Sequence, residues 1–214
     1  MTKEYMSSMD TLFSSYVSGT LPTPVQVLIE SHLELSNANH DFVSGLEMAA
    51  GDQLTSLAPT AFRNRDSALE AIFASEPVTR TKQQAASCDV LPTSLHDFIG
   101  FKVEDIPWKT KMPGFKEFDL PDVDGCHVSM FWIKPGRTVP AHTHEGVELS
   151  LIVDGAFHDT RGRFGRGDIS IADDSVDHRP TAEAERPCIG FAVCDGALRL
   201  TGPLHQRLGD IVAG

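Results

Sequence analysis

The sequence predicts an α+β multidomain protein, in which a small N-terminal helical bundle is followed by a C-terminal all-β domain. Two observations predict this division. Apolar residues recur every three to four positions in the first third of the chain and every second position after about residue 97. Glycine and proline residues then separate several short extended segments, which is typical of a β-barrel or a β-sandwich.

Three clear apolar stripes and one weaker stripe predict three or four short helices in residues 1–75. Gly19 and Gly51 follow two of these stripes and are expected to end their helices, because glycine is favoured just past a helix C-terminus. Thr23 and Pro24 form a typical helix start, with threonine as the N-cap and proline at the first helical position. The stripes are Met9–Val17, Val25–His32, Phe42–Ala50 and the weaker Asp66–Phe73.

Residues 76–97 contain few large apolar side chains and several proline, glutamine and serine residues, so we interpret them as a linker. The remaining residues, 98–214, are predicted to form the β-domain. Apolar and polar residues alternate in its candidate strands, as expected for strands with one buried face. These strands are His127–Ile133, Glu148–Val153, Asp168–Ile171 and Cys188–Cys194.

The charge of the chain is negative and unevenly distributed. The 214 residues have a formal net charge of -12. Direct binding to nucleic acid is therefore not expected, because phosphate contacts need a basic surface. No lysine or arginine occurs between Glu4 and Phe62. This stretch is either an ordinary solvated acidic surface or a binding surface for a basic protein.

Several features predict a cytoplasmic protein. No run of 18 apolar residues is present, so no membrane span is expected. The polar segment Met1–Met9 has no apolar signal core. The four cysteines are scattered, without a Cys-x-x-Cys pair, and are interpreted as free thiols in a reducing compartment. Cys188 and Cys194 share parity on one candidate strand, so both could face the barrel interior; we expect them to be small core residues, with a redox role as the less favoured alternative.

A cluster of histidines and one carboxylate predicts a metal site in the β-domain. His142, His144 and Glu148 occupy positions of equal parity, so an extended strand would point them to one side. His178, which follows an acidic turn, is the fourth candidate. Imidazole and carboxylate groups suit zinc, iron, manganese or nickel. The alternative is that these are surface polar residues of an edge strand.

The spacing of these residues resembles the two motifs of the cupin superfamily. Gly136, His142, His144, Glu148 and Gly155 follow the spacing of the first motif, and Gly167 and His178 follow that of the second. The second motif departs from the family pattern at Asp173, Ser175 and Ala182, but every ligand position is filled. The resemblance implies a jelly-roll barrel in which His142, His144, Glu148 and His178 bind one divalent metal, zinc first, with iron, manganese or nickel as alternatives.

The combination of acidic helices and a C-terminal cupin resembles the ChrR-type anti-sigma factors. The segments that carry this resemblance are Ser-Gly-Thr-Leu at 18–21, His-Leu-Glu-Leu at 32–35, His-Glu-Gly-Val-Glu-Leu at 144–149, Gly-Ala-Phe at 155–157, Arg-Phe-Gly-Arg-Gly-Asp-Ile at 163–169 and Ile-Ala-Asp at 171–173. The resemblance implies that the helices hold an extracytoplasmic-function (ECF) sigma factor inactive. It also implies that the cupin serves the response to singlet oxygen or related oxidants.

The helical part departs from this family at its zinc motif. The family pattern is His-x3-Cys-x2-Cys with a further histidine upstream, whereas this chain has His32, Ser36 and Asn39, with Ser7 near the upstream position. Serine and asparagine are poor zinc ligands compared with a thiolate. We therefore expect no zinc in the N-terminal helices and expect His32 to be a packed core residue.

Two functions of different classes follow from the sequence. The first is a regulator that binds an ECF-type sigma factor, with no direct nucleic-acid or membrane contact and a possible small-molecule ligand in the barrel. The second is a metal-dependent cupin enzyme, such as a dioxygenase, a lyase or an isomerase, because three histidines and one glutamate leave open coordination positions. No separate catalytic base or nucleophile stands out, so the regulator is the preferred interpretation.

Overall fold

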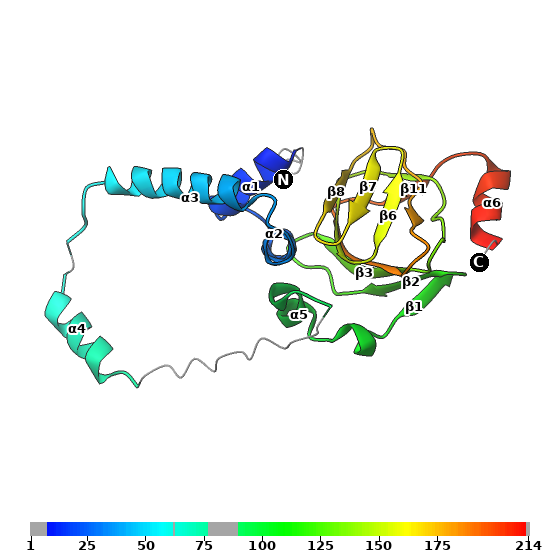
Figure 1. Ribbon diagram of the computed structural model, residues 1–214. Helices are drawn as coiled ribbons and strands as arrows, with labels where there is room; N and C mark the ends of the chain where they lie inside the picture. Colours follow the sequence, from blue (N-terminus) through cyan, green and yellow to red (C-terminus); the bar gives the residue numbers. More distant parts are fainter. Residues whose placement is uncertain (1–7, 62, 77–89, 213–214) are drawn as a thin grey trace.

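The computed structural model describes residues 8–61, 63–76 and 90–212. Helices form the N-terminal part, two antiparallel β-sheets and a two-stranded pair form the C-terminal part, and a final helix ends the described chain (Figure 1). The helices are α1 (Met9–Val17), α2 (Thr23–Leu35), α3 (His40–Thr55), α4 (Arg65–Ala74), α5 (Thr93–Ile99) and α6 (Leu204–Val212), with a short 3-10 helix at Val103–Asp105.

Local caps explain where the first two helices begin and end. Ser8 accepts a hydrogen bond from the Thr11 amide at 3.3 Å and caps α1. Gly19, at a φ of 68°, lets the chain turn after this helix, as predicted. Helix α2 begins one residue earlier than expected, with Pro22 as its N-cap. Asp124, from the loop between β2 and β3, accepts the Thr23 amide proton at 2.9 Å and links the helix start to the β-domain.

Helix α3 corrects one expectation about its end. It continues through Gly51 to Thr55, because Gly51 has no positive φ and so does not form the left-handed turn that would end a helix. Its apolar stripe contributes to the main core through the buried Val43 and the partly buried Leu46, while Phe42, which is 42% exposed, packs its ring edge against Phe13. Helix α4 forms where the weaker stripe predicted it and has no buried residue.

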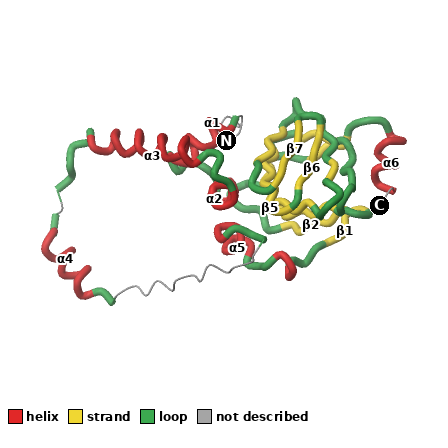
Figure 2. The backbone as a smooth tube through the Cα atoms, in the orientation of Figure 1, coloured by secondary structure: helices red, strands yellow, loops and turns green. Residues whose placement is uncertain are grey.

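The largest sheet has six strands in the order β1-β2-β3-β10-β5-β8, and all its neighbours are antiparallel. A smaller sheet has the order β7-β6-β9, and its strands β6 and β7 lie across from β2 and β5 of the large sheet (Figure 2). Strands β11 and β4 form a separate pair. The strands are β1 (Lys109–Met112), β2 (Phe115–Asp119), β3 (His127–Ile133), β4 (His142–His144), β5 (Glu148–Asp154), β6 (Ala156–Asp159), β7 (Gly162–Gly165), β8 (Ile169–Ala172), β9 (Thr181–Ala182), β10 (Cys188–Cys194) and β11 (Leu198–Leu200). The predicted strands at His127–Ile133 and Cys188–Cys194 match β3 and β10.

The main hydrophobic core joins the first helices to the large sheet. Helix α2 packs against α5 and against strands β5 and β10. Leu28 and Ile29 of α2, Leu95 of α5 and Phe191 of β10 belong to this one cluster and are fully buried. Helix α5 occupies the end of the segment interpreted as a linker, whose residues 77–89 lie outside the described chain. The domain boundaries at residues 75 and 97 therefore stay a prediction.

None of the helices that the structure describes combines the length and the apolar character that a membrane span requires.

Candidate metal centre

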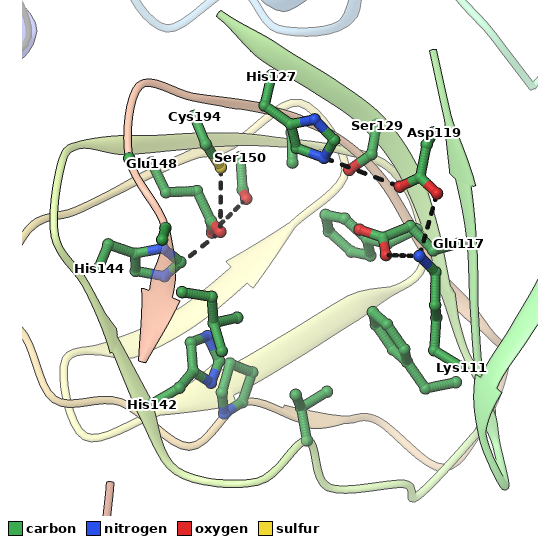
Figure 3. Close-up of a pocket in the computed structure, with 18 of the residues that line it drawn as sticks. Lys111, Glu117, Asp119, His127, Ser129, His142, His144, Glu148, Ser150 and Cys194 are labelled. Atoms are coloured by element: carbon green, nitrogen blue, oxygen red, sulfur yellow. Dashed lines mark hydrogen bonds and ion pairs between the residues drawn. The ribbon is translucent and has the colours of Figure 1, made fainter. Parts of the chain in front are cut away.

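Two strands and one connection bring the candidate ligands together in the barrel interior. His142 and His144 are the first and last residues of β4, and Glu148 is the first residue of β5. His178 lies between β8 and β9, and two backbone hydrogen bonds of 3.0 Å join it to His142. Figure 3 shows His142, His144 and Glu148 along one wall of the cavity. The three histidines are buried, with exposures between 2% and 5%.

The three imidazoles form a compact cluster. One ring nitrogen from each of His142, His144 and His178 lies within 4.8 Å of the others, and the ring centroids of His142 and His178 are 4.3 Å apart. The equal-parity argument thus placed His142 and His144 on the same side, and the second motif brought His178 to them. The alternative of surface polar residues is wrong for these histidines, because all three are buried.

Hydrogen bonds on the far side of two rings orient them. The Nδ1 of His142 lies 2.8 Å from the Pro140 carbonyl oxygen. The Nδ1 of His178 lies 3.2 Å from Asp159 Oδ2, and Arg161 in turn donates to Asp159 at 2.6 Å. At His142 the carbonyl acceptor fixes the proton on Nδ1 and leaves the lone pair of Nε2 free, the arrangement found behind metal-binding histidines. At His178 both the Asp159 carboxylate and, at 3.1 Å, the Arg161 guanidinium face Nδ1.

Glu148 stands beside His144 as an ionised carboxylate. Its Oε2 lies 3.4 Å from His144 Nε2, and its Oε1 accepts a hydrogen bond from Ser150 at 2.8 Å. Burial opposes ionisation, but His144, His142 and the Ser150 hydroxyl together outweigh it and lower the pKa of Glu148. Burial likewise lowers the pKa of His142, and burial with His142 as neighbour lowers the pKa of His178 to about 4. These two imidazoles are thus neutral at pH 7, as metal ligands must be.

The cluster contains buried ring nitrogens without hydrogen-bond partners in the described part of the chain, and a bound cation would give them a partner. Both ring nitrogens of His144 and the Nε2 of His178 are buried without a hydrogen-bond partner among the described residues. Leaving such polar atoms unpaired costs about 1–3 kcal/mol each. Three convergent imidazoles next to a carboxylate therefore fit a divalent metal better than they fit an empty core.

A cavity of about 770 Å³ opens above the cluster. Polar groups face the histidines across it: Lys111 pairs with Asp119 at 3.0 Å and with Glu117 at 3.3 Å (Figure 3). Apolar side chains line the space between the two polar ends, namely Phe115, Phe131, Ile133, Phe157 and Val139. This volume and this mixed lining are those of a small-molecule pocket.

Comparisons with known proteins place the chain in a family. A model described as the ChrR cupin-like domain matches residues 96–198. The anti-sigma-E factor ChrR of Cereibacter sphaeroides is 32% identical over 197 residues, which is 92% of each protein. The chain belongs to the ChrR family. The crystal structure of Rhodobacter sphaeroides SigE in complex with the anti-sigma ChrR includes a chain that superposes with a TM-score of 0.74 at 32% identity, over 88% of this chain and 97% of that one.

In this member of the ChrR family, the positions of the altered zinc motif form a contact between helices and barrel. His32 is 3% exposed, and its Nδ1 donates to the Gly167 carbonyl oxygen at 2.6 Å. The Asn39 amide donates to His32 Nε2 at 2.9 Å. Gly167, at a φ of 86°, approaches so closely that an added Cβ would lie 3.1 Å from the Ser36 Cβ. Ser7 lies outside the described residues.

This contact explains why His32 is a neutral, packed residue. Burial lowers the pKa of His32 by more than the bond to Gly167 raises it. A neutral ring with its proton on Nδ1 satisfies both hydrogen bonds, which leaves neither ring nitrogen free to bind zinc. The absence of zinc from these helices stays a prediction.

Sequence reasoning missed several residues that support the site. Asp159, Arg161 and Ser150 hold the ligands in place, yet no motif spacing pointed to them. The parity of Cys194 allowed it to face the barrel interior, and its thiol does face the cavity, but the sequence did not indicate that it lies 3.7 Å from Glu148 Oε2. The closeness of Cys194 to Glu148 depends on the pairing of β10 with β5, and no local sequence pattern reveals that pairing.

Proposed function

We propose that this chain binds an ECF-type sigma factor through its N-terminal helices and holds it inactive, while the barrel binds one divalent metal and responds to an oxidative signal. The observation that carries the binding role is the exposure of large apolar side chains on α3 and α4, which stand away from the barrel (Figure 1). Helices that present several large apolar side chains to solvent are suited to docking on a partner. Between 42% and 81% of each side chain is exposed in Phe42, Met48, Leu54, Ile72 and Phe73.

The likeness to the SigE–ChrR complex supports this role. The superposition extends over 88% of this chain and therefore includes helices as well as the barrel. The named partner in that complex is a sigma factor, and this chain keeps the same order of helices and cupin. Helices with large apolar side chains free for a partner are what a protein of this kind needs in its unbound form.

Charge adds a second element to the proposed interface. Asp41, Glu47, Asp52 and Glu70 are exposed on α3 and α4 and suit a basic partner. Glu34 is different, because its carboxylate accepts the Thr93 and Ser94 amide protons at 2.7 and 2.9 Å and so caps α5. Charge reversal at Glu34 would damage the fold, whereas reversal at Glu47 and Glu70 tests the interface.

Co-purification of the full-length chain with the sigma factor encoded beside it tests the proposal. Met48→Ser and Phe73→Ser should each weaken binding by about tenfold or more, since buried apolar anchors dominate interfaces. Leu204→Ser on α6 is the matched control, because Leu204 is 69% exposed but lies on the far side of the barrel in Figure 1. Equal binding by all three variants, or no capture by the wild type, would refute a sigma-binding role for α3 and α4.

For the metal, we propose that His142, His144, Glu148 and His178 form one site and that zinc occupies it. The paired, buried imidazoles and the neighbouring carboxylate support this ligand set. A bound zinc would supply a Lewis-acid centre with positions open toward the cavity. The surrounding residues hold the ligands: Asp159 fixes His178, Pro140 fixes His142 and Ser150 fixes Glu148.

The cavity also supports a second candidate function, that of a metal-dependent enzyme. Its volume of about 770 Å³ is large enough for a small molecule in contact with the metal. The same space would serve a regulator that senses such a molecule. The two roles differ in one measurement: a ligand of a regulator changes sigma-factor affinity and is recovered unchanged, whereas a substrate is converted.

A further inference from the structure

The register of two strands places a thiol beside the proposed metal ligands. Strand β10 pairs with β5 so that Cys194 lies directly opposite Glu148. The Cys194 thiol donates to Glu148 Oε2 at 3.7 Å, and its side chain faces the cavity (Figure 3). The position is therefore set by the sheet itself rather than by a flexible loop.

His144, Glu148 and Cys194 form a second group of potential ligands that shares His144 with the histidine cluster. One donor atom from each of the three lies within 4.8 Å of the others. Two ligands of one tetrahedral metal, with bonds of 2.0–2.3 Å, lie about 3.3–3.7 Å apart. The distances to Glu148 Oε2 are 3.4 Å from His144 Nε2 and 3.7 Å from Cys194 Sγ. The group is therefore already at the spacing of a metal site.

The state of His144 supports a cation at this place independently of the cysteine. The His144 side chain is 2% exposed, and both of its ring nitrogens lack a hydrogen-bond partner among the described residues. Its Nε2 is the atom that lies beside Glu148. A cation held between His144, Glu148 and Cys194 would satisfy that nitrogen and would also compensate the buried carboxylate.

We propose that Cys194 is a thiolate ligand of the metal in the barrel, and that it joins His144 and Glu148 on the side of the site that faces the cavity. This inference rests on the proposed metal site and adds a sulfur donor to its nitrogen and oxygen ligands. A thiolate favours zinc and cobalt over manganese or magnesium. The cysteine thereby makes the site more selective than three histidines and one glutamate would be.

The competing interpretation is that the thiol only positions Glu148 through a hydrogen bond. Substitution by serine separates the two roles, because a hydroxyl keeps the donor but is a much weaker ligand than a thiolate. Cys188 provides a matched control on the same strand. It is fully buried, and burial together with Asp154 raises the pKa of its thiol to about 12. Cys188 belongs to a separate apolar cluster and does not line the cavity.

The experiment is a titration of metal-free, full-length protein with Co²⁺, followed by absorption spectroscopy. All samples carry Cys88→Ser, so that this thiol does not contribute. We expect a thiolate-to-cobalt charge-transfer band in the near ultraviolet, in addition to the visible bands of bound cobalt. Cys194→Ser should lose the charge-transfer band and bind Zn²⁺ at least about tenfold more weakly, since even residues behind the ligands contribute 10–100-fold. Cys188→Ala should keep both properties.

The outcomes separate this inference from the metal site on which it rests. Visible cobalt bands without the charge-transfer band, in protein that is not substituted at Cys194, would overturn the cysteine ligand and leave the histidine site standing. Binding of neither Co²⁺ nor Zn²⁺ would overturn both. The test for the charge-transfer band uses protein with Cys194 intact. It therefore decides whether Cys194 is a ligand even if the Cys194→Ser variant is unstable.

Discussion

At the scale of single residues, the groups behind each imidazole determine how the cluster responds to acid. His178 has Asp159 on its Nδ1, whereas burial and His142 act on the ring as a whole. The net effect lowers its pKa from 6.5 to about 4. Between these two values the unfolded chain binds a proton that the folded, metal-free chain does not, so the free energy of unfolding falls as the pH falls through this window.

This shift gives a prediction for metal-free protein. Each unit of pKa corresponds to about 1.4 kcal/mol, so His178 should remove up to about 3 kcal/mol of unfolding free energy between pH 6.5 and pH 4. Urea unfolding at several pH values measures this effect, and His178→Gln, which does not titrate, is the reference. The stability of the wild type should fall more steeply than that of the variant. Parallel curves for the two proteins would contradict the shift.

The sequence predicted the ligands of this site better than their supports. His142, His144, Glu148 and His178 follow two motifs whose spacing is set by strand length and turn length, so counting residues was sufficient. Asp159 reaches His178 only because the hairpin of β6 and β7 folds over the site. Cys194 reaches Glu148 only through the register of β10 on β5. Contacts of this kind depend on sheet pairing, which local sequence patterns do not encode.

At the scale of elements, the helices show where periodicity alone is insufficient. The apolar stripe of α3 predicted a helix correctly, and Val43 and Leu46 of that stripe pack into the main core, but periodicity does not tell whether the rest of the helix surface has a partner in the same chain. The residues Met48 and Leu54 are 73% and 69% exposed. Helix α2 has the same kind of stripe, yet Leu28 and Ile29 are fully buried against the barrel.

The contact between α2 and the barrel gives an element-scale prediction. Asn39→Ala removes the donor to His32 Nε2 and leaves this buried nitrogen unpaired, which should cost about 1–3 kcal/mol of stability. Hydrogen exchange of the α2 amides in the full-length protein should become faster. Asn39 makes no side-chain cap bond to α3, so the loss is not one of helix capping.

Asn37→Ala is the control for this prediction. Asn37 is exposed in the same connection between α2 and α3, and its substitution should change stability by no more than about 0.5 kcal/mol. Addition of zinc should leave the exchange rates of α2 unchanged in all three proteins. Protection of α2 that rises with zinc would show that His32 binds metal after all.

At the scale of the whole molecule, the helices and the barrel share one core, but the candidate metal ligands lie in the barrel. Helix α2 is held by apolar packing and by the bond from His32 to Gly167. The histidine cluster lies inside the barrel, on the cavity side of the sheets. The described residues that could hold a metal, the groups around His142 and Glu148, are all in the barrel. Metal should therefore act on the barrel first, and on the helices only through α2.

The last prediction is that the purified protein contains about one metal per chain. Elemental analysis of full-length protein should give this ratio, and the combined substitution His142→Ala with His144→Ala should abolish it, because it removes two of the three proposed imidazole ligands. His158→Ala is the matched control: His158 is exposed on β6, outside the cluster, and its loss should leave the metal content unchanged. Two metals per chain, one of them retained in the double variant, would mean that Ser36 and Asn39 do not prevent zinc binding near His32. In that case the hydrogen bonds of His32 to Gly167 and Asn39 would have to break on metal binding, and the helices would be coupled to zinc directly rather than through the barrel.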